Sequence, residues 1–297
     1  MEIVLPKPGV YVIAVSGGVD SMTLLHILNN QKQKDKNWKL TVAHLDHGIR
    51  EDSVADRQLV QLASQNYGLP FVFHESHLGA GTGEARARQV RYEFLKSVMQ
   101  AASAEAIMTA HHRDDVLETA IINLLRGSGR KGLSSLTSRT ELVRPLLQVS
   151  KSELVTYAKD QGLIWREDST NEDIVYLRNY VRRRLLSKFD EESKNKLWQI
   201  IADMTSVNNQ LDELISTKLQ DQTFKGGLNR QWFNSLPHQV SKEVLAAWLR
   251  SHGCRSFDRK ILERLVVAAK VAAPGKVFPI LDGLSLRVYD DYLALTV

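Results

Sequence analysis

Residues 10–28 read VYVIAVSGGVDSMTLLHIL: an apolar strand, then a loop with two adjacent glycines, then a helix. A near-continuous apolar run of this kind is typical of a parallel strand that is buried on both faces. Further short apolar runs alternate with amphipathic stretches as far as about residue 161. This alternation predicts an α/β fold with a doubly wound parallel sheet, in which ligands bind beyond the carboxyl ends of the strands. The glycine loop lies at that end of the first strand.

The remaining elements follow from the same periodicities. We expect strands at 10–15, 40–44, 71–74, 106–110 and 141–144, and helices at 21–30, 53–67, 84–101, 115–126 and 150–161. After residue 162 the pattern changes to a loop, a basic helix at 178–189, and helical periodicity from 193 to about 270 before a strand-like tail. The sequence therefore predicts two domains, at 1–189 and 190–297, of which the second is smaller and mainly helical.

Composition narrows the class of protein. The net charge of +5 fits a partner rich in phosphate, although many basic proteins bind no nucleic acid. The single cysteine, Cys254, excludes a disulfide framework within the chain and a CxxC metal site. No apolar run approaches the roughly 20 residues of a membrane span, and the N-terminus lacks the pattern of a signal peptide. We therefore expect a cytoplasmic protein with no membrane partner.

The loop from Ser16 to Ser21 has the composition of a phosphate site. Gly17 and Gly18 allow phosphate to approach the backbone N–H groups, and the helix that follows points its positive end at the same place. Asp20 offers a carboxylate for Mg²⁺. A Walker loop would carry a lysine, which is absent here, so the loop favours pyrophosphate as a leaving group over γ-phosphoryl transfer. A plain strand–turn–helix connection is the simpler alternative.

A second polar segment, TAHHRDDVLET at 109–119, follows the fourth predicted strand. Asp115 and Glu118 are three residues apart at a helix start, so their carboxylates share a face. Such oxygen ligands suit Mg²⁺, which needs one or two carboxylates beside substrate phosphates. Zinc is the alternative, but the HExxH spacing is absent and no cysteine is near. The preference of acids for the first helical turn explains one aspartate but not the whole segment.

The string SGGVDS resembles the pyrophosphate loop of the N-type ATP pyrophosphatases, which adenylate a substrate with ATP and release pyrophosphate. Further strings resemble, in order, those of the tRNA(Ile)-lysidine synthetase family. They are VAHLDHGIR (42–50), EARARQVRY (84–92), TAHHRDDVLET (109–119), LRGSGRKGL (125–133), RPLL (144–147), DSTN (168–171) and RNYVR (178–182). Asp46 stands where many members carry Asn, and Val116 stands where the family has Gln. The resemblance covers the whole first domain, whereas the second domain shows no sharp motif.

The resemblance implies a role for each matching residue. The implied ATP-binding residues are Ser16, Gly17, Gly18, Val19, Asp20, Ser21 and His44. The implied catalytic residues are Asp20, Arg88, His112, Asp115 and Glu118, of which the three acids would also hold Mg²⁺. The implied tRNA-binding residues are Arg126, Arg130, Lys131, Arg178 and Arg182. For the arginines and lysine, the alternative is a solvated basic surface.

The implied reaction is an ATP-dependent ligation. ATP would adenylate the oxygen at carbon two of the wobble cytidine in an isoleucine tRNA with a CAU anticodon. The ε-amine of free L-lysine would then displace AMP and form lysidine. Lysine must attack as the neutral amine, and Asp46 beside His47 is a candidate to accept its proton. A homodimer is a further expectation of the resemblance.

Two other functions are compatible with parts of the sequence. A tRNA thiolase would use the same loop and the same adenylation, but it needs cysteines, and this chain has only Cys254. A nucleic-acid-binding module with an inactive nucleotide fold is the non-enzymatic alternative. Such a module would be expected to lose its acidic ligands, whereas Asp20, Asp115 and Glu118 are all present.

Overall fold

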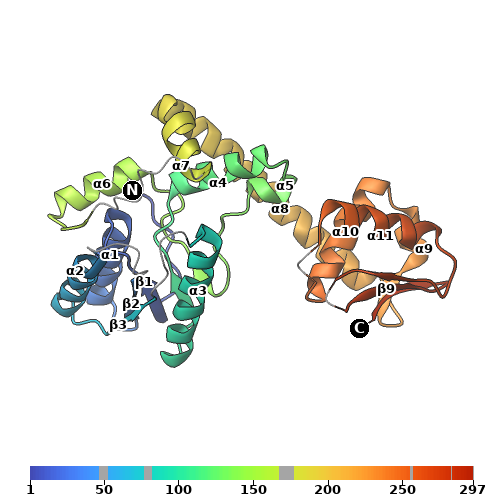
Figure 1. The fold of residues 1–297 in the computed structure, drawn as a ribbon, viewed down its shortest axis with the longest axis horizontal. Coiled ribbons are helices and arrows are strands. Elements are labelled where there is room, and N and C mark those ends of the chain that lie inside the picture. Colours follow the sequence, from blue (N-terminus) through green and yellow to red (C-terminus); the bar gives the residue numbers. More distant parts are fainter. Residues whose placement is uncertain (47–52, 77–81, 167–176, 255–256, 282, 297) are drawn as a thin grey trace. The chain divides into compact units, whose positions relative to one another are not determined.

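The structure, a computed structural model, describes residues 1–46, 53–76, 82–166, 177–254, 257–281 and 283–296. The chain divides into two compact units, Met1–Met204 and Thr205–Val297 (Figure 1). The limits of the catalytic domain at residues 1–189 stay a prediction. No helix in the described ranges is long and apolar enough to cross a membrane.

A five-stranded parallel sheet lies at the centre of the first unit, in the order β3-β2-β1-β4-β5. Its strands are β1 (Val10–Ala14), β2 (Lys39–Asp46), β3 (Phe71–Glu75), β4 (Ala106–Met108) and β5 (Leu142–Val143). The central strand β1 pairs with both β2 and β4, with Val12 opposite Thr41 on one side and Ile107 on the other. The predicted doubly wound parallel sheet is thereby confirmed.

Helices cover both faces of this sheet (Figure 1). The helices of this part of the chain are α1 (Val19–Lys34), α2 (Ser53–Asn66), α3 (Glu84–Ala101), α4 (Arg113–Leu125), α5 (Arg130–Leu133) and α6 (Lys151–Asp160). Helices α1, α2 and α6 pack on one face and α3 on the other, whereas α4 and α5 pack in a separate apolar cluster. Successive β1 side chains point to opposite faces: Ile13 packs in the core with α1, α2 and α6, and Val12 packs against Leu95 and Val98 of α3. Burial on both faces explains the continuous apolar run of this strand.

The topology brings two segments of interest together. The chain leaves β1 for β2 on one side and returns to β4 on the other, so the loops after β1 and β4 lie at the switch point where such sheets bind ligands. Helices α1 and α4 follow these loops, and each begins two residues before its predicted start. The reason is local, because Gly18 and His112 serve as the N-caps.

The basic segment predicted as one helix consists of three short helical pieces. They are α7 (Leu177–Tyr180), the π-helical turn η2 (Val181–Leu185) and the 3₁₀ turn η3 (Leu186–Lys188). Val181 and Leu186 are buried in one apolar cluster with Val116 and Leu117 of α4. This packing holds the arginine-rich segment against α4 and leaves Val116 directed into the core.

The second unit contains helices and a small antiparallel sheet. Helix α8 (Glu191–Asp221) crosses the boundary between the units and is followed by β6 (Thr223–Phe224), β7 (Gly227–Asn229), α9 (Arg230–Ser235), α10 (His238–Ser251), α11 (Arg259–Val271), β8 (Val277–Pro279), β9 (Ser285–Val288) and β10 (Tyr292–Thr296). The sheet order is β6-β7-β10-β9-β8. The strand-like tail corresponds to β9 and β10. The other strands have only two or three residues and produce no recognisable alternation.

Candidate active site

The loop after β1 is shaped by glycine and by two serines. Gly17 has a φ of +95°, which side-chain-bearing residues rarely adopt. The buried Ser21 hydroxyl donates to the Gly18 carbonyl at 2.9 Å and accepts from the Ser16 N–H at 3.1 Å. These contacts fold the loop over the start of α1, so that its backbone surrounds the positive end of the helix. The arrangement is suited to an anion.

A clamp from outside the motif holds the same loop. The Arg166 N–H donates to the Gly17 carbonyl at 3.1 Å, and its Nε donates to the Asp56 carboxylate at 2.8 Å. Asp56, in α2, also lies beneath Gly17, where a Cβ would meet its side chain at 3.4 Å. Arg166 and Asp56 therefore fix the loop conformation. Neither residue was among the predicted site residues, because nothing in their local sequence marks the contact.

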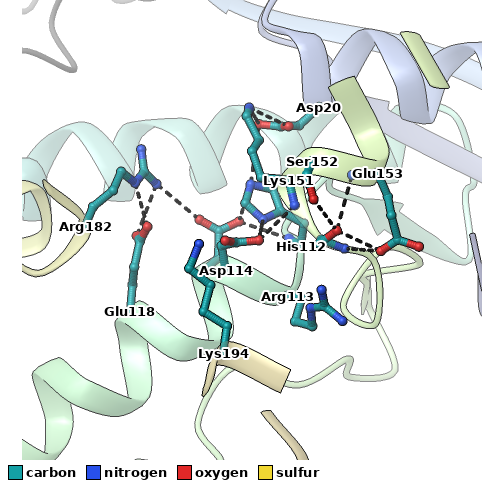
Figure 2. Close-up of polar contacts among 12 residues, drawn as sticks. Asp20, His112, Arg113, Asp114, Glu118, Lys151, Ser152, Glu153, Arg182 and Lys194 are labelled. Atoms are coloured by element: carbon teal, nitrogen blue, oxygen red, sulfur yellow. Dashed lines mark hydrogen bonds and ion pairs between the residues drawn. The ribbon is translucent and has the colours of Figure 1, made fainter. Parts of the chain in front are cut away.

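His112 lies at the centre of an acidic cluster (Figure 2). Its Nε2 lies 3.6 Å from Asp20 Oδ2 of the phosphate loop and 3.6 Å from Asp115 Oδ2 of α4. Its Nδ1 lies 3.6 Å from Asp114 Oδ2. The imidazole is buried, and its backbone N–H donates to Asp115 at 3.0 Å. The structure thus brings the predicted residues Asp20, His112 and Asp115 together.

The acids determine the charge of this imidazole. Burial alone would lower the pKa of His112, but the three carboxylates, with Asp115 foremost, outweigh it and raise the pKa to about 10. Burial likewise opposes ionisation of Asp114, yet the contacts with His112 and with the Lys151 N–H lower its pKa to about 2. His112 is therefore a fixed cation at neutral pH.

Lys151, the first residue of α6, contacts the phosphate loop. Its Nζ lies 2.7 and 2.8 Å from the two carboxylate oxygens of Asp20. Burial would raise the pKa of Asp20, but His112 and Lys151 together lower it. The local sequence predicted a helix here and no function for Lys151, since the contact joins residues far apart in the chain.

Glu118 is almost completely buried, and its carboxylate is bound by arginines. Arg182 Nε and NH2 donate to its two oxygens at 2.5 and 3.1 Å, and Arg178 Nε lies 3.7 Å away. Arg182 also lies 3.6 Å from Asp115 Oδ1. Burial raises the pKa of Glu118 and the arginines oppose this, while the carboxylate raises the pKa of Arg182. Arg182 and Glu118 thus form a bidentate, charge-assisted contact.

The pKa of the neighbouring His111 is lowered, whereas that of His112 is raised. Its Nδ1 lies 2.8 Å from the Thr109 hydroxyl. Burial lowers its pKa to about 4, and the positive charges of Arg144, Arg88 and Arg178 contribute to the lowering. His111 is thus neutral at pH 7, while the adjacent His112 is charged. The predicted residue Arg88 lies in α3, with its guanidinium 4.9 Å from the Tyr92 ring centroid, and its charge acts on His111.

The remaining predicted residues are distributed around this centre. His44 is buried and its Nδ1 lies 2.8 Å from the Val15 carbonyl, so it supports the strand that carries the loop. Asp46 is buried at the end of β2, whereas His47, Arg50 and the segment 168–171 lie outside the described residues. Arg126 is exposed at the end of α4, and Arg130 and Lys131 belong to α5. Roles in ATP or tRNA binding for these residues stay predictions.

The acids do not form a ready-made metal cage. Within the ranges that the structure describes, no group of three His, Cys, Asp or Glu side chains is arranged to hold a metal ion. Asp20, Asp115 and Glu118 are instead matched by the cations Lys151, His112 and Arg182. The Mg²⁺ roles of the three acids stay predictions, and any ion here would share Asp20 and Asp115 with those cations or with a ligand.

The sequence of this chain is similar to those of known proteins. The family model described as PP-loop domain matches residues 5–189. The tRNA(Ile)-lysidine synthase of Thermotoga sp. (strain RQ2) is 37% identical over 216 residues, which cover 70% of this chain and 52% of the relative. The tRNA(Ile)-lysidine synthase of Chlorobaculum tepidum is 30% identical over 297 residues, covering 95% of this chain and 89% of that protein.

A solved structure shares the fold. The U34-tRNA thiolase NcsA from Methanococcus maripaludis, solved with its [4Fe-4S] cluster, superposes with a TM-score of 0.57 at 19% identity, covering 68% of this chain and 74% of that one. Relative lengths differ, since the chain spans about half the length of several curated relatives, including the Thermotoga protein. The matched residues, the parallel sheet and its glycine loop together show that the chain belongs to the tRNA(Ile)-lysidine synthase family of PP-loop proteins.

Proposed function

We propose that this chain ligates L-lysine to carbon two of the wobble cytidine in an isoleucine tRNA with a CAU anticodon. ATP is consumed through an adenylated tRNA intermediate, and the products are lysidine, AMP and pyrophosphate. The observation that carries the proposal is the convergence of Asp20 and Asp115 on one protonated imidazole, His112, beside the phosphate loop. Membership of the lysidine synthase family supports the choice of substrates.

In the first step, the cytidine oxygen attacks the α-phosphorus of ATP, and the bond to pyrophosphate breaks. Negative charge then develops on the α-phosphate and on the leaving pyrophosphate. The loop N–H groups would hold the pyrophosphate, while the His112 cation and Arg88 would neutralise charge at the α-phosphate. Preformed charges of this kind need no reorganisation during the reaction.

In the second step, the lysine amine attacks carbon two, and AMP leaves with the former carbonyl oxygen. The amine must first lose a proton, because free lysine is almost wholly protonated near neutral pH. The buried carboxylate of Asp46, at the end of β2, is a candidate acceptor. His111 is neutral at pH 7, so it can hydrogen-bond to substrate without adding charge.

Magnesium fits the donor chemistry of this centre. The partly exposed carboxylates of Asp20 and Asp115 face the same imidazole nitrogen, and Mg²⁺ commonly uses one or two carboxylates together with substrate phosphates. These two acids would hold the ion, which would supply positive charge to the phosphates. Glu118 is bound on both oxygens by Arg182, so it would join them only after release from that arginine.

The RNA would be held by the basic residues around the site. Arg126 is exposed at the end of α4, and α5 contributes Arg130 and Lys131. Phosphate contacts from such residues position an RNA without reading its sequence. Arg178 and Arg182 both contact Glu118, so they would link RNA binding to the ATP site. A cytoplasmic location and a homodimer complete the proposal.

The two alternatives weighed for the sequence are less well supported. The chain's single cysteine, Cys254, belongs to the second unit, where it packs against the apolar core. A thiolase reaction would therefore lack a sulfur-carrying pair. A non-catalytic module would not need the acids Asp20, Asp115 and Glu118, which are all present and each lie beside a cation.

The proposal can be tested by direct product detection. Purified protein is incubated with ATP, Mg²⁺, radiolabelled lysine and an isoleucine tRNA transcript with the CAU anticodon. The matched control is the same transcript with uridine at the wobble position. We expect label in the first RNA and none in the second. In a parallel reaction without lysine, ATP labelled at the α-phosphate should leave label on the tRNA, and added lysine should convert it to AMP.

Two results would contradict the proposal in different ways. If no α-phosphate label reaches tRNA without lysine, and lysine adenylate forms once lysine is added, the enzyme activates the amino acid rather than the base. Equal incorporation of lysine into both transcripts would mean that the wobble cytidine is not the acceptor.

A further inference from the structure

Lys151 brings a positive charge to the phosphate loop from a distant part of the chain. The string SGGVDS has no lysine, yet the Lys151 ammonium lies within 2.8 Å of both carboxylate oxygens of Asp20 in that loop. Figure 2 shows the side chain reaching from the start of α6 to Asp20. A helix that follows the last strand of the sheet thus delivers a lysine to the site.

A purely structural role explains this contact poorly. The Lys151 and Asp20 side chains are 43% and 28% exposed, and half-exposed ion pairs contribute little to folding stability. Helix α6 is held to the core by other residues, since Leu154 and Ala158 are completely buried. The lysine is therefore not needed to attach its helix.

The backbone of Lys151 is held by contacts that do not involve its side chain. Its N–H donates to Asp114 Oδ2 at 2.8 Å, and α6 begins with a reciprocal cap between Ser150 and Glu153. Asp114 in turn contacts His112, so the base of Lys151 is tied to the catalytic cluster. The flexible stem can then move the ammonium over the loop without moving the helix.

We propose that Lys151 supplies, from α6 of the same chain, the phosphate-binding ammonium that the loop lacks. Before ATP binds, Asp20 holds the ammonium over the loop. When ATP enters, Nζ passes from the Asp20 carboxylate to oxygens of the β- and γ-phosphates, which the loop holds as the leaving pyrophosphate. The exchange leaves Asp20 available to a metal ion. This inference rests on the proposed function for the identity of the leaving group.

The test compares ligands that differ only in their phosphates. Equilibrium affinities for ATP, inorganic pyrophosphate and adenosine are measured with Mg²⁺ for wild type, Lys151→Met and Lys151→Arg. Lys159→Met is the matched control, since Lys159 lies in the last turn of the same helix. Lys151→Met should weaken ATP and pyrophosphate binding about 10- to 100-fold, the usual effect of removing a charged hydrogen bond. Adenosine binding should change less than about twofold, and Lys151→Arg should retain most of the affinity for pyrophosphate.

The outcomes separate this inference from the proposed function. Equal pyrophosphate affinity in wild type and Lys151→Met, with both proteins equally stable to urea, overturns the role of Lys151 even if wild type makes lysidine. If Lys151→Met selectively loses pyrophosphate affinity while wild type incorporates no lysine into tRNA, the role of Lys151 is supported and the proposed function is overturned. If Lys151→Met does not fold, Lys151→Gln takes its place: a loss of pyrophosphate affinity that Lys151→Arg does not share supports the inference, and an affinity equal to that of wild type contradicts it.

Discussion

Replacement of His112 by Gln should reveal a pH-dependent stability that an ordinary histidine does not confer. In the folded protein the pKa of His112 is raised to about 10, against 6.5 for an unperturbed imidazole. A raised folded-state pKa gives stability that is fully present below pH 6.5 and is lost as the pH rises through 10. Gln preserves the approximate size of the side chain but removes the charge, so the difference between the two proteins isolates this contribution.

The magnitude follows from the two pKa values. The linkage relation gives a charge contribution of about 5 kcal/mol at pH 6, about 3 kcal/mol at pH 8 and about 1 kcal/mol at pH 9.5. An independent comparison agrees, because removing one partner of a buried ion pair typically costs about 3–5 kcal/mol. The side chain of His112 is only 6% exposed, so solvent screening reduces these values little.

The assay is urea unfolding of wild type and His112→Gln at pH 6, 8 and 9.5. We expect the difference in unfolding free energy to fall steadily across this range, at about 1.4 kcal/mol per pH unit above pH 7. NMR titration of ¹³Cε1-labelled histidines provides a second measurement, in which one imidazole remains protonated at pH 8.5. A difference that is constant from pH 7 to 9.5, or that changes only near pH 6.5, would refute the raised pKa.

Three further predictions concern the surroundings of the site. Asp20→Asn or Glu118→Gln should abolish turnover but leave tRNA affinity within a few-fold of wild type, since both acids face cations in the proposed ATP site. AMP release is measured by chromatography, and a near-normal rate in either variant would remove that acid from catalysis. Asp56→Asn should weaken ATP binding measured by calorimetry about tenfold, because it frees the Arg166 side chain that holds the loop, and unchanged affinity would mean that the loop holds its shape alone. Binding of tRNA, measured by filter retention against salt, should fall with a log–log slope of up to about one for each phosphate neutralised, and lysine binding should depend on salt much less. A flat response would remove one group of residues from the RNA surface: Arg126, Arg130, Lys131, Arg178 and Arg182.

Much of the site was accessible from the sequence because its signals are local. An apolar run, two glycines and a helix start specify the phosphate loop within a dozen residues, and the alternation of periods specifies the parallel sheet. The doubly wound topology brings the loops after β1 and β4 together, so that Asp20 and Asp115, whose joint role the resemblance implied, lie around one imidazole. The π-helical turn at Val181–Leu185 could not be predicted, since its arginines show the pattern of an ordinary basic helix.

The charge partners of the acids were decided by tertiary structure alone. Lys151 meets Asp20, Arg166 meets Asp56, and Arg182 meets Glu118 across long separations in sequence. No local pattern marks these pairs, because the sequence around a lysine or arginine is the same whether its side chain faces water or a carboxylate. The opposite protonation of His111 and His112, adjacent in the chain, also depends on tertiary structure. Burial dominates the pKa of His111, whereas the three aspartates around His112 outweigh its burial.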